Sequence, residues 1–294
     1  MLVSPSTVAA RYRSEIRREI RALGTRLKVV GFLAGDYGPS HTYAEYTREA
    51  CEDLGIAYEL RHVPRLDLEK YIRQANEDPS VHGIMVYYPI FGNEQDRYLK
   101  DVVDHRKDIE GLNSFWIRKL YENERLVADA ENTGKAVVPC TALSVLKILE
   151  ANGAYGASGT RPAEHKTVTI FNRSEVVGRP LAVMMSNDGA RVYSFDEFGP
   201  LLYENGRAVE TEITRAEALK SSDMVITGVP SRAFPKIRLE EIAPHAICLN
   251  FATIKNFAPE AQEGAELFIP RVGPVTVAMC MRNTLRLYRT YFAS

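Results

Sequence analysis

Short apolar runs alternate along this chain with longer stretches whose apolar residues recur every three or four positions. The runs have the length of buried strands, and the spaced stretches are typical of helices packed on a sheet. The expected strands are 27–33, 56–62, 83–88, 167–171, a run ending at 196, 223–227, 246–251 and 266–269. The expected helices are 6–23, 40–54, 66–76, 94–103, 139–152, 176–187 and 274 onward. This alternation predicts an α/β fold in which helices cover the faces of parallel sheets.

A segment rich in Gly, Ala, Ser and Pro, 153–165, is the most linker-like part of the chain. We therefore expect two α/β domains with a cleft between them. The second is expected to be a Rossmann-type dinucleotide-binding domain with a parallel sheet. Their predicted bounds are 1–150 together with the C-terminal helix 274–294 for the first, and 151–273 for the second. The polar section 121–135 is expected to be a loop, and 197–214 a polar excursion from the second sheet.

The composition excludes several classes of protein. The 37 basic and 38 acidic residues give a net charge of −1, so no nucleic-acid surface is indicated. We find no signal core and no apolar run long enough to span a membrane. The four cysteines and six histidines are scattered without ligand spacing, which indicates no metal site and no disulfide frame. A cytoplasmic protein without a bound metal is the expectation.

The segment 166–196 reads as strand, turn, helix and strand, the unit that binds dinucleotides. Its glycine fingerprint is reduced to Gly178, and Asn172 stands where a first glycine is usual; Asn tolerates the left-handed backbone that such a turn needs. Asp196 ends the second strand, where a carboxylate accepts a hydrogen bond from a ribose 2′-hydroxyl and repels a 2′-phosphate. Asp196 therefore favours NAD over NADP, unless it only begins the following loop.

Ligands of open parallel sheets bind beyond the carboxyl ends of the strands. In the second domain this rule selects the loops 172–175, 228–231 and 252–254 together with the Asp196 region. In the first domain it selects 35–43 and 87–91, and the gap between the domains is the natural place for a second ligand.

Three groups of residues in the predicted first domain are candidates for chemistry. Tyr43 and Thr47 are four apart on a predicted helix and share a face, although Tyr43 is equally consistent with a core residue. Glu110 precedes a glycine turn, where a carboxylate can bind the paired N–H edge of a pterin or purine, or lie in a solvated loop. The third group, 272–276, is a tight turn into the last helix that either caps the helix or closes over a ligand.

In order and context, these groups resemble the methylenetetrahydrofolate dehydrogenase/cyclohydrolase family over nearly the whole chain. The segments that carry the resemblance are SHTYAEYTREAC (40–51), GIMVYYPI (83–90), KDIEGLN (107–113), PCT (139–141), NRSEVVGRP (172–180), TGVP (227–230) and VGPVTVAM (272–279). Each segment alone is a weak signal, but seven in the family's order are specific.

Departures from the family pattern are equally informative. Thr47 stands where the family has the lysine of the cyclohydrolase step, and Tyr87 where its VQLP segment has glutamine. Glu110 replaces the usual aspartate, Asn172 a glycine, and one glycine is missing before Val272. With these departures the chain resembles the monofunctional, NAD-dependent branch of the family.

The chemistry explains why these losses do not abolish oxidation. Hydride passes from the methylene bridge between N5 and N10 of the folate to the nicotinamide, and the cation that remains is shared by both nitrogens. No general base is needed; the two carbons must lie within roughly 3 to 3.5 Å of each other. Cyclohydrolase activity instead requires water activation and nitrogen protonation by a titratable group, which Thr47 is not. We therefore expect a dehydrogenase without cyclohydrolase activity.

The resemblance also implies roles for individual residues. Tyr43 would pack on the p-aminobenzoyl ring, Glu110 would hold the pterin edge, and Thr47 marks the catalytic lysine position. The implied substrate-binding residues are Tyr43, Tyr87, Tyr88, Glu110, Gly273, Pro274 and Thr276. The implied NAD-binding residues are Thr141, Asn172, Arg173, Ser174, Val176, Asp196, Gly228, Val229, Pro230 and Thr253. Some relatives use an arginine at the position of Arg173 for a 2′-phosphate, whereas pairing with Asp196 would exclude NADP more firmly.

Three other functions remain open from the sequence. The first is the bifunctional enzyme, with another residue in the role of the lysine that Thr47 replaces. The second is a non-catalytic folate- or nucleotide-binding regulator on the same fold. An unrelated Rossmann dehydrogenase would need a histidine–carboxylate pair, and no histidine has an evident partner in the sequence. The resemblance further implies a homodimer.

Overall fold

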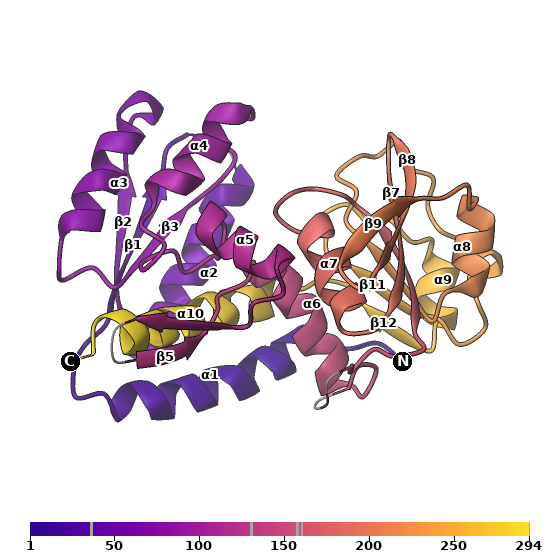
Figure 1. The fold of residues 1–294 in the computed structure, drawn as a ribbon, viewed down its shortest axis with the longest axis horizontal. Coiled ribbons are helices and arrows are strands. Elements are labelled where there is room, and N and C mark those ends of the chain that lie inside the picture. Colours follow the sequence, from indigo (N-terminus) through magenta and orange to yellow (C-terminus); the bar gives the residue numbers. More distant parts are fainter. Residues whose placement is uncertain (36–37, 130–131, 157–158, 160, 294) are drawn as a thin grey trace. The chain divides into compact units, whose positions relative to one another are not determined.

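A computed structural model describes residues 1–35, 38–129, 132–156, 159 and 161–293. Parts of the predicted loop 35–43 and linker 153–165 therefore lie outside the described residues. The chain forms two compact units (Figure 1). Unit 1 contains Met1–Val8 and Thr141–Val275, and unit 2 contains Ala9–Cys140 and Thr276–Ser294.

These units differ from the predicted domains at three places, the smallest being residues 274–275, which group with unit 1 and not with the rest of the C-terminal helix. Residues 1–8 and 141–150 group with unit 1, although we assigned both to the first domain. The N-terminus joins unit 1 because its backbone pairs with the last strand: Val3 N donates to Phe268 O at 2.9 Å, and Phe268 N donates to Met1 O at 2.8 Å. Sequence periodicity does not register such a long-range pairing.

Unit 2 is built on a three-stranded parallel sheet of order β2-β1-β3. Its strands are β1 (Lys28–Leu33), β2 (Ala57–His62) and β3 (Gly83–Val86). Its helices are α2 (Gly38–Leu54), η1 (Arg65–Asp67), α3 (Leu68–Glu77), α4 (Glu94–Val102) and α5 (Ser114–Tyr121), with most of α1 (Pro5–Arg21) and α10 (Gly273–Tyr291). The chain leaves β1 towards β2 on one side and reaches β3 on the other, so the gap between β1 and β3 is a topological switch point.

The prediction of a loop over residues 121–135 was wrong. It contains an antiparallel hairpin of β4 (Leu126–Asp129) and β5 (Asn132–Lys135), and α5 precedes it in a stretch that the apolar pattern left irregular. Both strands are only four residues long, and β5 has no apolar residue, so the pattern does not distinguish the hairpin from a loop.

Unit 1 contains a seven-stranded sheet of order β12-β11-β10-β6-β7-β8-β9. Its parallel strands are β6 (Thr167–Phe171), β7 (Arg191–Asp196), β10 (Met224–Thr227), β11 (Ile247–Asn250) and β12 (Leu267–Ile269). Its helices are α7 (Gly178–Asn187), α8 (Arg215–Ser221), η2 (Leu239–Glu241) and α9 (Pro259–Gly264), with most of α6 (Cys140–Ala151). The predicted Rossmann-type parallel sheet is confirmed, and its switch point lies between β6 and β10.

The polar excursion 197–214 is largely strand. It forms β8 (Gly199–Glu204) and β9 (Arg207–Glu210), which extend the sheet antiparallel beyond β7. Every residue of β9 is exposed, which explains why its sequence has no apolar periodicity.

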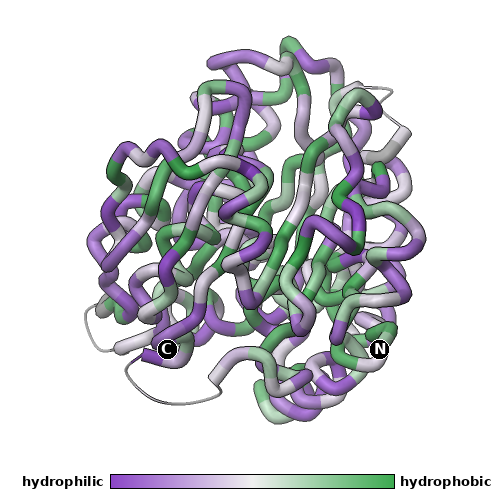
Figure 2. The backbone as a smooth tube through the Cα atoms, turned by 90° about the vertical axis from the view of Figure 1, so that its right-hand side faces the viewer, coloured by the Kyte–Doolittle hydropathy of each residue, from purple (hydrophilic) through white to green (hydrophobic). Residues whose placement is uncertain are grey.

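Each unit has its own apolar core. In unit 2 the side chains of β1 and β3, including Phe32, pack against Leu68 and Ile72 of α3. In unit 1 Phe171, Leu219 and Phe257 belong to the core around β10 and β11. Figure 2 shows green, hydrophobic segments alternating with purple, hydrophilic ones along the chain. Within the described ranges, no helix is both long and apolar enough to cross a membrane.

Candidate functional site

The turn from β6 to α7 lies at the switch point of unit 1 and is organised by Asn172. The Asn172 Oδ1 atom accepts hydrogen bonds from Ser174 N at 3.0 Å, Ser174 Oγ at 2.7 Å and Gly178 N at 3.1 Å. Its Nδ2 donates to Gly228 O at 2.9 Å, which ties the turn to the end of β10. A Cβ atom on Gly178 would collide with the Asn172 carbonyl group, so the close packing of this turn requires glycine.

The amino end of α7 is thus capped from within the chain. Gly178 N is bonded to Asn172 Oδ1 and lies 3.4 Å from Ser174 Oγ, and Val177 N lies 3.3 Å from the same hydroxyl. A phosphate at this helix end would compete with the Asn172 side chain for these donors. Asn172, Arg173, Ser174 and Val176 do lie together here, with Ser174 exposed.

Asp196 lies at the carboxyl end of β7, where the sequence places the ribose acceptor. Its Oδ1 atom is 2.9 Å from Arg173 Nη1 and also accepts from Phe198 N at 2.8 Å. Its Oδ2 atom has no hydrogen bond among the described residues, and the side chain is 22% exposed. A carboxylate oxygen that is accessible and unshared fits a ribose hydroxyl.

The Arg173 side chain binds groups at the carboxyl end of β7 and the start of β8. Its Nη2 atom donates to Ser194 O at 2.6 Å and to Gly199 O at 2.5 Å, and its side chain is only 8% exposed. A guanidinium group bound to two carbonyls and a carboxylate has few donors left for a second anion. Of the two alternatives that the sequence left open for Arg173, the structure has the pairing with Asp196.

The loop after β10 brings the predicted Gly228, Val229 and Pro230 to the other side of β6. Two asparagines that the sequence analysis missed hold it. Asn256, 1% exposed, accepts from Val229 N at 2.9 Å and donates to Val229 O at 3.1 Å, and Asn256 N donates to Asn250 Oδ1 at 3.2 Å. Their signal in the sequence is a pair of amides flanking the loop after an apolar strand.

The remaining predicted cofactor residues are further along unit 1. Thr253 is exposed in the loop after β11, and Thr141 is half-buried in the first turn of α6. Neither has a contact in the described residues that assigns it to a ligand, and both roles stay predictions.

In unit 2 the predicted aromatic residues meet at the switch point between β1 and β3. Tyr43 on α2 and Tyr87 after β3 make an edge-to-face contact with ring centroids 5.8 Å apart. The Tyr87 hydroxyl is 2.6 Å from that of Tyr58 on β2. Burial raises the pKa of Tyr87 far above its ordinary value, and the neighbouring Tyr58 raises it further. Both phenols therefore act as neutral hydrogen-bonding groups.

Thr47 is fully buried one turn after Tyr43. Its Oγ1 atom donates to Tyr43 O at 2.9 Å and lies 3.7 Å from Met85 Sδ. The hydroxyl thus serves the backbone of its own helix. The Tyr43 hydroxyl is 3.9 Å from Cys280 Sγ on α10, a neighbour that the sequence analysis did not identify.

Glu110 is a carboxyl group in an apolar and aromatic environment. Its Oε2 atom accepts from Val86 N at 3.3 Å. Burial, followed by the nearby charge of Asp108, raises the pKa of Glu110 to about 8, while the charge of Lys100 lowers it. At neutral pH the side chain is mostly protonated and can both donate and accept a hydrogen bond.

The carboxylate of Asp108 shapes the turn that carries Glu110. It accepts four backbone N–H groups: Glu110 at 3.1 Å, Gly111 at 3.0 Å, Leu112 at 2.7 Å and Asn113 at 2.7 Å. Gly111 has φ of +73°, and a Cβ atom there would lie 2.7 Å from Val138 O, so only glycine suits the position. Burial raises the pKa of Asp108 to about 6, against the lowering effect of these four bonds.

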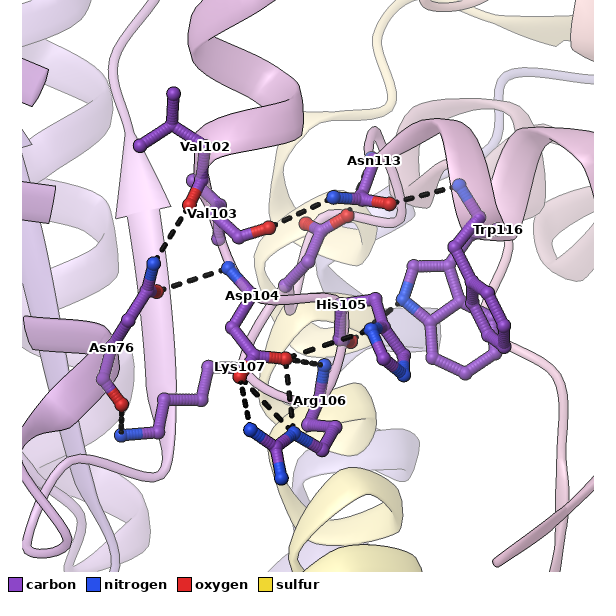
Figure 3. Close-up of polar contacts among 11 residues, drawn as sticks. Asn76, Val102, Val103, Asp104, His105, Arg106, Lys107, Asn113 and Trp116 are labelled. Carbon is purple, nitrogen blue, oxygen red and sulfur yellow. Dashed lines mark hydrogen bonds and ion pairs between the residues drawn. The ribbon is translucent and has the colours of Figure 1, made fainter. Parts of the chain in front are cut away.

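The segment that leads into this turn is fixed at both ends (Figure 3). The Asn76 side chain donates to Val102 O at 2.7 Å and accepts from Asp104 N at 2.9 Å. Lys107 Nζ donates to Ala75, Asn76 and Asp78 carbonyls at 2.7 to 3.0 Å, which caps the carboxyl end of α3. Asn113 and Trp116 secure the other end through Val103 O and His105 O, both at 2.8 Å. Glu110 is therefore presented from a rigid support.

Tyr88 lies near the Glu110 carboxyl group. Its hydroxyl is buried without a hydrogen-bond partner among the described atoms, and Lys100 Nζ lies 5.4 Å from its ring centroid. An unsatisfied buried hydroxyl next to Glu110 is a position where a bound polar ligand would supply the missing bond.

The predicted closing residues lie at the start of α10. Gly273 and Pro274 are half-buried in unit 1, and Thr276 is 4% exposed in unit 2. Val275 N donates to Val272 O at 2.9 Å, which forms the expected tight turn. Their closure over a substrate stays a prediction.

Comparison with known proteins shows which family the chain resembles. Residues 3–110 match the family model for the catalytic domain of tetrahydrofolate dehydrogenase/cyclohydrolase. Methylenetetrahydrofolate dehydrogenase [NAD(+)] of Dictyostelium discoideum is 42% identical, with 99% of this chain and 95% of the relative covered. The protein of the same name from Saccharomyces cerevisiae is also 42% identical, over 97% and 94%.

A solved structure is also very similar. The NAD-dependent 5,10-methylenetetrahydrofolate dehydrogenase from Saccharomyces cerevisiae has a TM-score of 0.91 at 39% identity, covering 98% of this chain and 96% of the other. The likeness covers both units and the expected motifs, so the resemblance inferred from the sequence is confirmed. The chain belongs to the tetrahydrofolate dehydrogenase/cyclohydrolase family.

Proposed function

We propose that the protein is an oxidoreductase that converts 5,10-methylenetetrahydrofolate to 5,10-methenyltetrahydrofolate with NAD, and that it has no cyclohydrolase activity. Relatives that cover nearly the whole chain are NAD-linked methylenetetrahydrofolate dehydrogenases by name. Tyr43 and Tyr87 are in contact at the switch point of the unit 2 sheet, and Asn172 is bonded to Gly228 at the switch point of the unit 1 sheet, which supports the proposal.

The observation that carries the proposal is the environment of Thr47. A buried hydroxyl bonded to Tyr43 O stands at the position of the family's catalytic lysine. It has no titratable proton near neutral pH, so it cannot protonate a folate nitrogen or activate water. Hydride transfer needs neither, because the cation that forms on the substrate is shared by N5 and N10.

The residues of unit 2 bind and orient the folate. The neutral Glu110 carboxyl offers one donor and one acceptor to the pterin edge, and Val86 N fixes its orientation. Tyr43 packs on the p-aminobenzoyl ring, and Tyr87 supports it from the side. Tyr88 contributes an unsatisfied hydroxyl, and Thr276 belongs to the same unit. Gly273 and Pro274 of unit 1 complete the proposed substrate set.

The residues of unit 1 hold the dinucleotide. When bound, NAD supplies the carbon that accepts the hydride. Asp196 accepts from the adenosine ribose, and its charge disfavours a 2′-phosphate by on the order of 1 to 4 kcal/mol. Arg173 has few donors left for a 2′-phosphate, because it already binds Asp196, Ser194 O and Gly199 O.

The test is a spectrophotometric assay of purified protein with methylenetetrahydrofolate and either NAD or NADP. NADH formation with strong preference for NAD is expected. No NADH above background would identify a non-catalytic binding protein, and equal use of NADP would show that Asp196 has another role.

Cyclohydrolase activity is measured separately, as enzyme-dependent hydrolysis of methenyltetrahydrofolate. We expect none above the uncatalysed rate. If hydrolysis is found, the bifunctional alternative is correct, and Lys100 is the amine to examine because it lies over the Tyr88 ring and acts on Glu110. Lys100→Met would then abolish hydrolysis and leave NADH formation.

We propose that the protein is a cytoplasmic homodimer without a nucleic-acid partner and without membrane association. The resemblance implies the homodimer, and the net charge of −1 supports the absence of a nucleic-acid partner. Light scattering on the purified chain measures the assembly, and a monomeric mass would refute the dimer.

A further inference from the structure

Phe198 is the most exposed large apolar side chain in the described part of the chain, at 86%. A single exposed apolar residue needs no explanation by itself. The position of Phe198 is unusual because it stands at the tip of a rigid hairpin, two residues after Asp196. An exposed ring on a hydrogen-bonded backbone, two residues from a ribose acceptor, is suited to a ligand.

The hairpin is tight and internally bonded. β7 and β8 pair antiparallel with Asp196 opposite Gly199, so the loop contains only Glu197 and Phe198. Phe198 N donates to Asp196 Oδ1 at 2.8 Å, and Gly199 adopts φ of +101°. The backbone of Phe198 is therefore fixed to the same carboxylate whose other oxygen is open.

Arg173 anchors the hairpin to the β6–α7 turn. One guanidinium group spans both strands of the hairpin, binding Ser194 O on β7 and Gly199 O on β8. The turn that carries Arg173 also holds Asn172 and Ser174, which are bonded to each other. Phe198, Asp196 and the turn thus form one connected surface at the carboxyl end of the sheet.

We propose that Phe198 binds the adenine of NAD, stacking its ring on the base while Asp196 Oδ2 accepts from the ribose. This inference rests on the proposed function. Adenine is a flat π-system attached to the ribose, so a ring two residues from the ribose acceptor can reach its face. Phe198 is then the affinity and specificity residue for the adenosine half of the cofactor, and it selects a nucleobase without reading a 2′-substituent.

The first test is calorimetric binding of ADP-ribose and nicotinamide mononucleotide to the wild type and to Phe198→Ala. Loss of base–aromatic stacking should weaken the affinity for ADP-ribose by about tenfold or more. The affinity for nicotinamide mononucleotide should stay unchanged. Leu66→Ala is the matched control, because Leu66 is 83% exposed in unit 2 and has no proposed role. Phe198→Tyr should retain the affinity of the wild type.

A second readout follows the ring directly. The chain has one tryptophan, Trp116, which is fully buried in unit 2. In Phe198→Trp, ADP-ribose should quench the fluorescence of the introduced indole, while the same titration of the wild type leaves the Trp116 signal unchanged. Unchanged ADP-ribose affinity in Phe198→Ala overturns the inference.

The competing role for an exposed ring is contact with a second copy of the chain. Dissociation of the Phe198→Ala assembly in light scattering, with nucleotide affinity retained, would assign Phe198 to that contact and overturn the inference. A wild-type protein that binds neither NAD nor ADP-ribose overturns the proposed function itself. Binding by the wild type with no loss in Phe198→Ala refutes only the stacking role.

Discussion

Asp196 in unit 1 and Glu110 in unit 2 are both carboxyl groups near the carboxyl end of a parallel sheet, but their partners differ. Asp196 is paired with a guanidinium group at 2.9 Å and retains 22% exposure. Glu110 is half-buried and accepts a hydrogen bond from Val86 N, and burial raises its pKa to about 8. Two chemically similar side chains thus differ in their ion pairing and in their affinity for a proton.

The difference shows how environment, more than residue type, sets the chemistry of a site. A charged acceptor suits a ribose and excludes a phosphate, whereas a neutral carboxyl suits a heterocycle that presents donors and acceptors together. Breaking each environment separately should therefore produce distinct effects.

The largest effect is expected from Asp196→Ser. Removing the carboxylate removes its repulsion of a 2′-phosphate, so the ratio of kcat/KM for NAD over NADP should fall by about a hundredfold. Steady-state kinetics with both cofactors measure this ratio. Glu197→Ser, an exposed acid in the same hairpin, is the control and should leave the ratio unchanged. An equal change in both variants would point to general surface charge.

The second largest effect is a pH dependence of the free energy of unfolding that is caused by the ionisation of Glu110. The pKa of Glu110 is about 8 in the folded protein, compared with its ordinary value of 4.5. The folded state therefore binds the proton more tightly, and the free energy of unfolding falls as pH rises between these two values. Between pH 6 and pH 8 the free energy of unfolding should drop by about 2 kcal/mol, and Glu110→Gln should remove that drop. Urea unfolding at several pH values measures it.

Glu59→Gln is the control for that experiment. Hydrogen bonds from Arg61 and Lys28 lower the pKa of Glu59 to about 2, so its stabilising effect is complete above its ordinary value of 4.5 and is lost only as pH falls towards 2. The slope between pH 6 and pH 8 should therefore match the wild type. The same slope in Glu110→Gln as in the wild type would contradict a raised pKa at Glu110.

A smaller effect is expected from Arg173→Met, which leaves Asp196 without its partner. The buried guanidinium makes hydrogen bonds to Ser194 O and Gly199 O as well, so the free energy of unfolding should fall by about 1 to 2 kcal/mol. Urea unfolding measures the loss, and NAD binding should weaken because the hairpin is released. Arg179→Met, whose guanidinium is 43% exposed and 3.8 Å from Glu175, should change both by far less.

The smallest effect is expected from Thr47→Val. The substitution removes the hydroxyl bonds to Tyr43 O and Met85 Sδ, so stability should fall by about 1 kcal/mol or less while NADH formation persists. A large loss of kcat would show that the hydroxyl takes part in the reaction and would refute its proposed role as a passive replacement for lysine.

Much of the fold was predictable because the parallel strands are buried on both faces. β1, β6 and β10 are continuous apolar runs, and their positions in the sequence agree with the structure. The antiparallel strands β4, β5, β8 and β9 were not predicted, since they lie in largely polar segments that contain no long apolar run. The motifs placed Tyr43, Glu110, Arg173 and Asp196 correctly on strand ends, helix starts and turns.

The amino-acid sequence by itself determined the fold class, the family, and the absence of a lysine at position 47. Only the tertiary structure decided the partner of Arg173, the protonation of Glu110 and the capping of α7 by Asn172. These depend on burial and on contacts between residues distant in sequence, such as Asn172 with Gly228. Local patterns report which residues are near in the chain, whereas the energy of a charge or a hydrogen bond depends on what surrounds it in space.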